Sequence, residues 1–270
     1  MSSEVGPQQM LETAVAAARE AGALQKERLW GEFSFSFKGE VDLVTEVDRA
    51  CEEMIVNRIR SAFPSHSFLA EENLYPGGDP AFRWIIDPLD GTTNYAHGFP
   101  WFCVSIALER QGELSLGVIY HCMMDELFTA TRGGGAFLNG SPIRVSTRTP
   151  LRQSLIATGF PYDASRDNEN NFRNFFELQL AARGVRRAGA AALDLAYVAA
   201  GRLDGYWECK LKPWDVAAGS LLVTEAGGRV TNHGGLPHRV GDHRILATNG
   251  AIHEEIVALL DRAGKAEPVL

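Results

Sequence analysis

The sequence lacks the features that would place it in a membrane or a secretory pathway. No apolar run approaches the ~20 residues that span a bilayer, and the first residues, Met-Ser-Ser-Glu-Val-Gly, lack the basic-then-apolar order of a signal peptide. These absences favour a cytoplasmic protein without a membrane partner.

Cysteine is also scarce, with only Cys51, Cys103, Cys122 and Cys209 in the chain. Their spacing is wide and irregular and contains no C-x-x-C pair, which argues against a zinc ribbon or a redox motif. We expect four buried thiols.

Positive charge is too sparse for a nucleic-acid-binding surface, because the formal net charge is -8. An anionic substrate remains compatible with this balance, since a bound cation reverses the field locally. The chain also lacks internal repeats and low-complexity tracts, and its 270 residues suffice for one large or two medium domains.

What the sequence does contain is a dense group of acids and hydroxyls in Trp84-Ile-Ile-Asp-Pro-Leu-Asp-Gly-Thr-Thr-Asn94. The segment predicts a buried strand followed by a turn at Pro88 that brings Asp87 and Asp90 together. Two like charges ~4 Å apart repel by ~4 kcal/mol at an effective dielectric near 20. Protonation would relieve this repulsion, but a divalent ion is the commoner solution, and ligands that are all oxygen favour Mg²⁺.

Further acids occur in comparable settings elsewhere, and together these segments resemble the inositol monophosphatase family. The resemblance extends roughly from Lys38 to Gly228. It rests on the central motif and on three other segments: Val41-Asp-Leu-Val-Thr-Glu-Val-Asp48, Ala70-Glu-Glu-Asn73 and Lys212-Pro-Trp-Asp-Val-Ala-Ala-Gly219. Ala70 replaces a glycine that is common in the family. Members are Mg²⁺-dependent, lithium-sensitive phosphatases, and they include fructose bisphosphatases and nucleotide 3'-phosphatases.

The resemblance implies two or three Mg²⁺ ions and assigns their ligands. One ion would be held by Glu71, Asp87 and the Leu89 carbonyl, and a second by Asp87, Asp90 and Asp215. Taken alone, Glu71 with Glu72 could be a solvated pair on a loop, and Asp215 could simply favour a helix N-terminus.

The resemblance also assigns the residues that act on the attacking water. Glu71 would bear on this water, while Thr92 and Asp48 would orient it. The pattern Thr45-x-x-Asp48 is equally typical of a helix start, and both interpretations can hold together.

The remaining candidates concern the substrate. Gly91 permits close backbone approach, so phosphate oxygens would meet N–H groups of Gly91, Thr92 and Thr93. By resemblance, further substrate contacts would come from both halves of the chain: Lys38, Asp90, Arg186, Ala191, Glu208 and Asp215. Local sequence alone would make Lys38 a turn residue, Arg186 a solvated side chain and Glu208 an exposed charge at a strand end.

Periodicity predicts two regions of different architecture. In the first, we expect helices over 9–29 and 45–62, a hairpin over 33–44, and a mainly antiparallel sheet with strands at 84–86, 103–108, 114–120 and 127–131. In the second, strands at 155–158, 185–187 and 206–208 alternate with helices at 168–183 and 190–200, and a further helix opens near Asp215, which suggests an α/β unit. We place the boundary near Ser146, giving an N-terminal α+β domain over 1–145 and a C-terminal α/β domain over 146–270. The resemblance implies that the two form a five-layered αβαβα sandwich, and that the protein is a homodimer.

The sequence therefore predicts a hydrolase for the phosphate monoester of a small metabolite. A metal-activated water would attack phosphorus without a covalent intermediate, and inositol 1-phosphate is the first candidate. Histidinol phosphate, fructose 1,6-bisphosphate and nucleotide 3'-phosphates are alternatives, because the ligand set is shared among them. A regulatory binding protein on the same fold is the alternative from another class.

Overall fold

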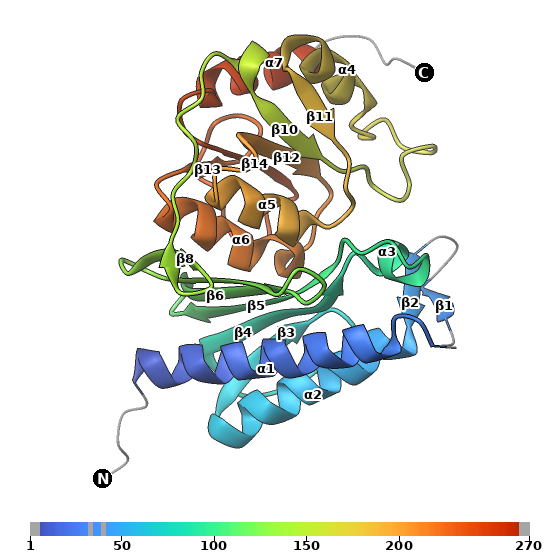
Figure 1. The fold of residues 1–270 in the computed structure, drawn as a ribbon, viewed down its shortest axis with the longest axis vertical. Coiled ribbons are helices and arrows are strands. Elements are labelled where there is room, and N and C mark those ends of the chain that lie inside the picture. The colour runs from blue at the N-terminus through green and yellow to red at the C-terminus, as the bar shows by residue number, and fades with distance from the viewer. Residues whose placement is uncertain (1–5, 32–34, 39–41, 265–270) are drawn as a thin grey trace.

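The structure, a computed structural model, describes residues 6–31, 35–38 and 42–264, with the backbone alone for 35–38 and 42–44. Figure 1 shows the chain stacked in five layers, in which two outer helix layers and one central helix layer alternate with two sheets. The predicted αβαβα sandwich is confirmed.

The first sheet has seven strands, and their spatial order follows the sequence order from β3 to β9. The β3 and β4 strands are parallel, and every later pair is antiparallel. The mainly antiparallel character is as expected, whereas the short strands β8 and β9 were not anticipated. The strands are β3 (His66–Ala70), β4 (Asp79–Asp90), β5 (Cys103–Arg110), β6 (Glu113–His121), β7 (Glu126–Thr131), β8 (Gly135–Leu138) and β9 (Ser141–Pro142).

Helices α1 (Pro7–Arg28) and α2 (Glu46–Ala62) cover the outer face of this sheet. Both lie close to their predicted positions. Leu11 and Val15 are only partly buried, and the fully buried positions are mainly alanines from Ala14 to Ala21. Small side chains let a helix approach a sheet closely.

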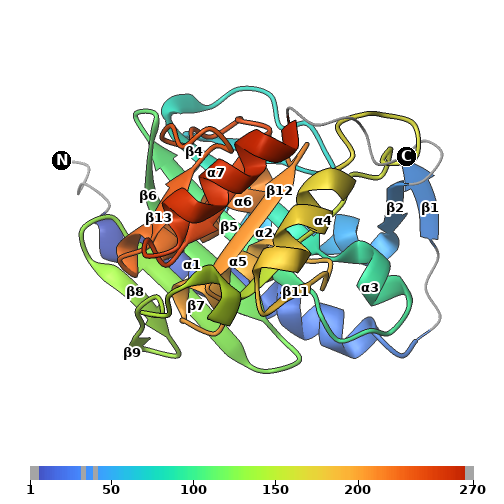
Figure 2. The same ribbon diagram turned by 90° about the horizontal axis from the view of Figure 1, so that it is seen from above.

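The expected hairpin is present in the described residues as β1 (Phe35–Lys38) paired antiparallel with β2 (Asp42–Thr45). Phe33 and Val41, which were included in that prediction, lie outside the described residues. Figures 1 and 2 both place this hairpin beside the short helix α3 (Thr92–Ala96).

The second sheet is mixed and has the strand order β11-β10-β12-β14-β13. The β10 strand runs parallel to β11 and β12, whereas β14 runs antiparallel to β12 and β13. The last two strands were not foreseen, because the alternating pattern stops near Gly228. The strands are β10 (Leu155–Thr158), β11 (Gly184–Arg186), β12 (Gly205–Cys209), β13 (Arg229–Thr231) and β14 (Arg244–Thr248).

Helices lie on both faces of this second sheet. The α5 (Ala191–Ala199) and α6 (Pro213–Glu225) helices fill the central layer, and α4 (Phe172–Ala181) and α7 (His253–Gly264) form the outer one. Figure 2 shows α4 and α7 lying across the sheet. The α4 helix begins later than predicted, because Asn171 has a left-handed backbone (φ 69°) that the helix cannot include.

Three apolar clusters hold the layers together. One lies between α1, α2 and the first sheet, a second between α4, α7 and the second sheet, and the largest surrounds α5 and α6 and includes residues from both sheets. The central layer is therefore apolar almost throughout, which makes a charged side chain within it conspicuous. All four cysteines are free and buried, as expected.

The first sheet ends at Pro142 and the second begins at Leu155. We propose a domain boundary between these strands, near Ser146. No helix among the described residues is long and apolar enough to span a membrane.

Candidate active site

A pocket of about 520 Å³ opens between the first sheet on one side and the central helices and second sheet on the other. It brings together segments far apart in sequence: the end of β4, the start of α3, the loop after β10, the start of α5, the end of β12 and the start of α6. Most of the predicted site residues line it. These are Glu71, Asp87, Leu89, Asp90, Gly91, Thr92, Thr93, Ala191, Glu208 and Asp215.

The motif that carries Asp87 and Asp90 forms a bulge inside a strand rather than a separate turn. Asp87 pairs with Ser105 and Asp90 with Cys103, so β4 has one more residue than β5 over this stretch. Pro88 has no N–H for the ladder, which suits it to the bulge. Both carboxyl groups reach the pocket from one rigid strand.

The two carboxyl groups are buried, with only 2% of Asp87 and 9% of Asp90 exposed. Asp87 Oδ1 accepts from the Leu89 N–H at 3.0 Å, and Asp90 Oδ2 accepts from the Ala192 N–H at 2.7 Å. Burial raises the pKa of both carboxyls well above the usual value, and the charges of Glu71 and Asp215 raise these pKa values further. The pocket thus concentrates negative charge that an added cation would neutralise.

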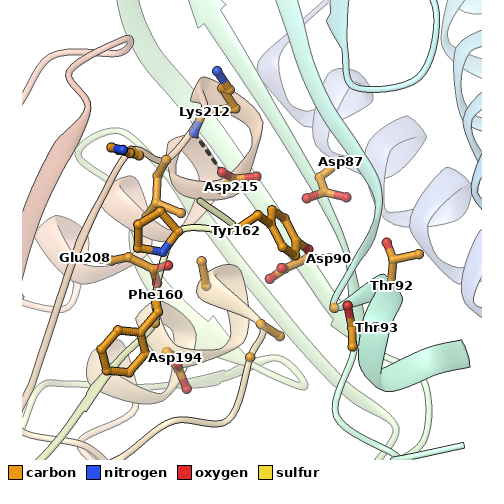
Figure 3. Close-up of a pocket in the computed structure, with 18 of the residues that line it drawn as sticks. Asp87, Asp90, Thr92, Thr93, Phe160, Tyr162, Asp194, Glu208, Lys212 and Asp215 are labelled. Carbon is orange, nitrogen blue, oxygen red and sulfur yellow. Dashed lines mark hydrogen bonds between the residues drawn. The ribbon is translucent and has the colours of Figure 1, made fainter. Parts of the chain in front are cut away.

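Glu71 follows the last residue of β3 and Asp215 lies in the first turn of α6, so the two acids come from opposite halves of the chain. Asp215 accepts from the backbone N–H of Lys212 at 2.7 Å, an interaction drawn in Figure 3. The helix start that its position suggested is therefore real, and it fixes the side chain at the pocket wall. Across the described ranges, nowhere are three or more His, Cys, Asp or Glu side chains already grouped as a metal centre.

Asp48 does not line the pocket but supports it from behind. Its Oδ1 accepts from the Thr92 hydroxyl at 2.9 Å, while its Oδ2 accepts from the Thr45 N–H at 2.8 Å and from the Thr45 hydroxyl. The Thr45 side chain in turn accepts from the backbone of Asp48, which completes a capping box. The helix start that the Thr45-x-x-Asp48 pattern predicts is confirmed, and the same Asp48 carboxyl also bonds to Thr92.

Gly91 joins the bulge to α3 with a left-handed backbone (φ 94°). A Cβ at this position would lie 2.9 Å from the Trp101 carbonyl oxygen, so glycine is required for conformation and for space. Thr92 and Thr93 begin α3, and the N–H groups of a first helical turn have no acceptor within the helix. These N–H groups are donors at the edge of the pocket.

On the opposite side, Glu208 near the end of β12 presents a carboxyl group that is 9% exposed. Burial raises the pKa of Glu208 to about 7. A hydrogen bond from the Tyr206 hydroxyl at 2.5 Å and the positive charge of Arg187 lower this pKa, but by less than burial raises it. A Cβ on Gly159 would lie 2.2 Å from Glu208 Oε2, so glycine at 159 leaves the carboxyl its position.

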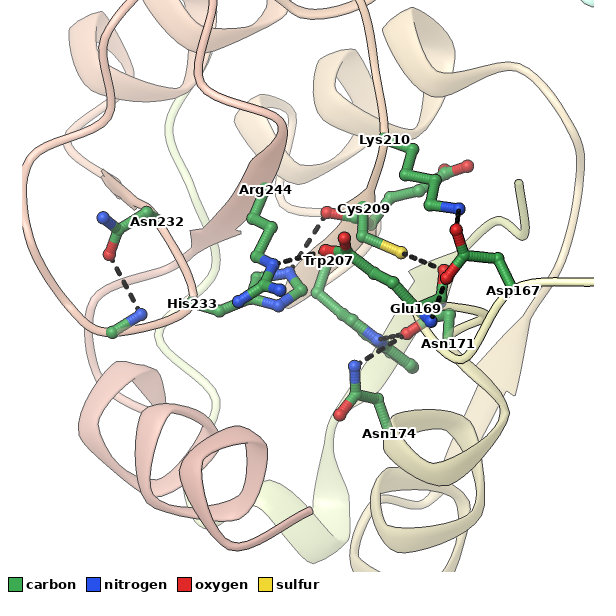
Figure 4. A network of polar contacts seen from close by, with 12 residues as sticks. Asp167, Glu169, Asn171, Asn174, Trp207, Cys209, Lys210, Asn232, His233 and Arg244 are labelled. Atoms are coloured by element: carbon green, nitrogen blue, oxygen red, sulfur yellow. Dashed lines mark hydrogen bonds and ion pairs between the residues drawn. The ribbon is translucent and has the colours of Figure 1, made fainter. Parts of the chain in front are cut away.

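A polar network behind β12 holds that strand in place (Figure 4). A ring nitrogen of His233 lies 3.1 Å from the Glu208 carbonyl oxygen, and Trp207 Nε1 donates to Asn171 Oδ1 at 2.9 Å. Lys210 pairs with Asp163 at 2.8 Å and Asp167 at 2.9 Å. These contacts tie the loop after β10 to the end of β12, so the residues before and after Glu208 are both held in place.

One substrate candidate, Arg186, does not reach the pocket. Arg186 is exposed, donates to the Val185 carbonyl at 3.3 Å and does not line the pocket, whereas its neighbour Arg187 does. Successive side chains point to opposite faces along an extended chain, which explains why a one-residue shift changes the result. The side chain of Lys38 lies outside the described residues.

Some lining residues had no counterpart in the sequence-based assignment. Phe160 and Tyr162 come from the loop after β10, and Asp194 comes from α5. Asn94 ends the motif segment and had no assigned role, yet its Nδ2 donates to the carbonyl oxygens of Trp101 at 2.8 Å and Ala188 at 2.9 Å, which joins the two halves. Asp194 is the single charged residue in the apolar run 190–200, and this isolated charge could have marked it as a site residue from the sequence.

Comparisons with known proteins agree with the geometry. The model of the inositol monophosphatase family matches residues 7–265. The chain is similar to an inositol-1-monophosphatase from Synechocystis, with 48% identity over 92% of this chain and 88% of that protein, and to the Nus factor SuhB of Pseudomonas aeruginosa, with 48% identity over 90% and 92%. The structure resembles that of an inositol monophosphatase from Anabaena, with a TM-score of 0.87, 44% identity and coverage of 97% and 98%.

Proposed function

The chain belongs to the inositol monophosphatase family, and on that premise we propose that it is a Mg²⁺-dependent phosphate monoester hydrolase whose first substrate is inositol 1-phosphate. The observation that carries the proposal is one pocket in which Asp87 and Asp90 face Glu71 and Asp215, with Thr92 at the edge.

The candidate ligands suit Mg²⁺, because all of them are oxygens. The acids are buried and repel one another, so a cation bound among them would relieve the repulsion. Two or three ions would be held by Glu71, Asp87, the Leu89 carbonyl, Asp90 and Asp215. When bound, such ions lower the pKa of a water nucleophile and stabilise the charge of the leaving oxygen.

Thr92 and Asp48 would orient the attacking water. A hydroxyl has one proton to donate, and the Thr92 proton has two acceptors within reach, Asp48 Oδ1 at 2.9 Å and the Leu89 carbonyl at 3.1 Å. If the Leu89 carbonyl holds a cation, the proton goes to Asp48. The lone pairs of Thr92 then face the pocket and accept a hydrogen bond from water, which sets its direction toward phosphorus.

The phosphate itself would be bound by the backbone N–H groups of Gly91, Thr92 and Thr93. Water attacks phosphorus as the ester P–O bond breaks, and the leaving oxygen takes a proton, so the products are an alcohol and inorganic phosphate. Glu208 and Ala191 lie on the other side of the pocket, where the alcohol would sit, and Arg187 takes the place expected for Arg186.

A second role deserves a direct test, because several similar proteins are named as Nus factors. The retained acids and the Asp48–Thr92 bond favour an enzyme, since binding a partner protein requires neither. A regulatory protein on this fold is the alternative that turnover would separate from the enzyme.

We also propose the remaining family properties for this chain. These are a homodimer, a cytoplasmic location and inhibition by Li⁺, which could occupy a Mg²⁺ position after turnover. Indifference to tens of millimolar Li⁺, an order-of-magnitude limit, would place the protein among the lithium-tolerant members.

The test is phosphate release from a panel of monoesters with and without Mg²⁺. The panel contains inositol 1-phosphate, histidinol phosphate, fructose 1,6-bisphosphate and a nucleoside 3'-phosphate. The proposal expects Mg²⁺-dependent turnover with the highest kcat/KM on inositol 1-phosphate. No turnover of any member would reject the enzyme, and preference for another ester would change only the substrate.

A further inference from the structure

The central layer contains a carboxyl group that belongs neither to the candidate metal ligands nor to the water-orienting pair. Asp194 lies in the first turn of α5, is 2% exposed and lines the pocket. Its Oδ1 is buried and has no hydrogen-bond partner. A buried acceptor without a donor lowers stability, so such a group calls for an explanation.

A structural role is the simplest alternative, because acids favour the start of a helix. The geometry speaks against it. The Ala192 N–H at the start of α5 is already bonded to Asp90 Oδ2 at 2.7 Å. Burial, followed by the negative charges of Glu208 and Asp90, also raises the pKa of Asp194 well above the usual value, and a carboxyl that loses its charge loses its attraction to the helix dipole.

The surroundings of Asp194 instead suit a polyol. Figure 3 shows Asp194 on the same side of the pocket as Glu208 and Phe160, away from Asp87 and Thr92. Two acids beside an aromatic ring offer hydrogen bonds to hydroxyls and an apolar surface to a carbon skeleton.

We propose that Asp194 is a specificity-determining residue whose carboxyl group turns about its Cβ–Cγ bond, so that the unpartnered oxygen forms a hydrogen bond with a hydroxyl group of the leaving alcohol. The inference rests on the proposed phosphatase function and extends it by assigning a residue that recognises the hydroxyl groups of the leaving alcohol. The buried oxygen gains its missing partner only when such a substrate is bound.

The test compares inositol 1-phosphate with phenyl phosphate, whose leaving group has no additional hydroxyl. Asp194→Ala should lower the ratio of the two kcat/KM values about tenfold, the loss of roughly one hydrogen bond. Asp194→Asn, which keeps an acceptor oxygen, should restore most of that ratio. The melting temperature of Asp194→Ala should stay level or rise, because an unsatisfied buried group is removed.

Tyr197→Phe is the matched control on the same helix, since the Tyr197 hydroxyl bonds to Glu126 at 2.8 Å and does not line the pocket. It should leave the substrate ratio unchanged. Asp194→Leu offers an apolar side chain of similar size if the alanine variant does not fold, and it should lose the same selectivity.

A substrate ratio that stays constant in the Asp194→Ala or Asp194→Leu protein would overturn the inference while the proposed function stands. A lowered melting temperature with equal losses on both esters would show a structural role and would overturn it as well. If the wild-type protein hydrolysed neither ester, the proposed function would fail and this inference with it.

Discussion

Thr92 donates its hydroxyl proton to Asp48 Oδ1 over 2.9 Å, joining residues 44 positions apart in sequence. Asp48 is itself fixed by the capping box at the start of α2, so the orientation of Thr92 depends on a helix terminus rather than on a loop. This rigidity is what a water-orienting hydroxyl needs, because small displacements of a reacting group are costly.

Replacing Thr92 by alanine should therefore reduce kcat more than it raises KM. The hydroxyl acts on a water whose direction matters mainly in the transition state, and loss of such a contact typically costs about 10²- to 10⁴-fold. Steady-state kinetics on the preferred ester measure both constants.

Thr92→Ser is the control, since it keeps the hydroxyl and should retain most of the turnover. If KM rose in Thr92→Ala while kcat stayed constant, Thr92 would be a phosphate-binding residue instead.

The neighbouring arginines provide a matched pair of substitutions. Arg187→Ala should raise KM about threefold to tenfold, a modest effect because the side chain is exposed and its charge is screened. Arg186→Ala should change KM by less than about twofold, because its charge is also screened by solvent and it does not line the pocket. Equal effects, or a larger effect at Arg186, would show that the pocket does not determine which arginine acts.

The Glu208→Gln variant distinguishes two possible substrates. An amide oxygen still accepts a proton from a polyol hydroxyl, so inositol 1-phosphate should lose only the ~0.5–1.5 kcal/mol of one neutral contact. Histidinol phosphate carries an ammonium group, and it should lose more because an ion pair disappears. Wild-type preference for histidinol phosphate, with a selective loss in the variant, would replace the inositol assignment and leave the metal chemistry intact.

Glu208 should also make stability depend on pH. Its pKa in the folded protein is raised to about 7 from 4.5, so the protonated form is favoured by folding. The stability that this group contributes is fully present below pH 4.5 and is lost as the pH rises toward about 7. Glu208→Gln does not titrate, so its free energy of unfolding relative to wild type should increase over that interval, by at most about 3 kcal/mol.

Urea unfolding at pH 5 and pH 8 in the absence of Mg²⁺ measures this difference. A free-energy difference between the two proteins that is the same at both pH values would mean that the Glu208 carboxyl titrates normally.

The sequence predicts the structure best where chemistry and local periodicity coincide. The Asp87–Thr93 motif has few structural explanations, so its residues were assigned by type and order, and the pocket brings them together. The α2 helix was equally predictable, because Thr45 and Asp48 mark its start and the apolar spacing continues to Ile59.

Features that depend on tertiary packing were harder to obtain. The buried face of α1 follows from alanines that let it approach the sheet, and β14 pairs with a strand far away in sequence. Arg187 and Asp194 reach the pocket through the exact register of a strand end and a helix start. An assignment accurate to one or two residues cannot resolve that register, although the charge of Asp194 in an apolar run was a usable signal.

In the proposed mechanism the acids of the pocket act through Mg²⁺, and one titration tests this directly. Phosphate release from inositol 1-phosphate is followed as Mg²⁺ is added back to EDTA-treated wild-type and Asp90→Asn protein. Asparagine keeps an oxygen for the Ala192 N–H, so the variant should remain folded. We expect no turnover before Mg²⁺ is added, recovery in the wild type, and little recovery in Asp90→Asn. Full activity in excess EDTA, or wild-type turnover by the variant, would contradict the metal-dependent mechanism.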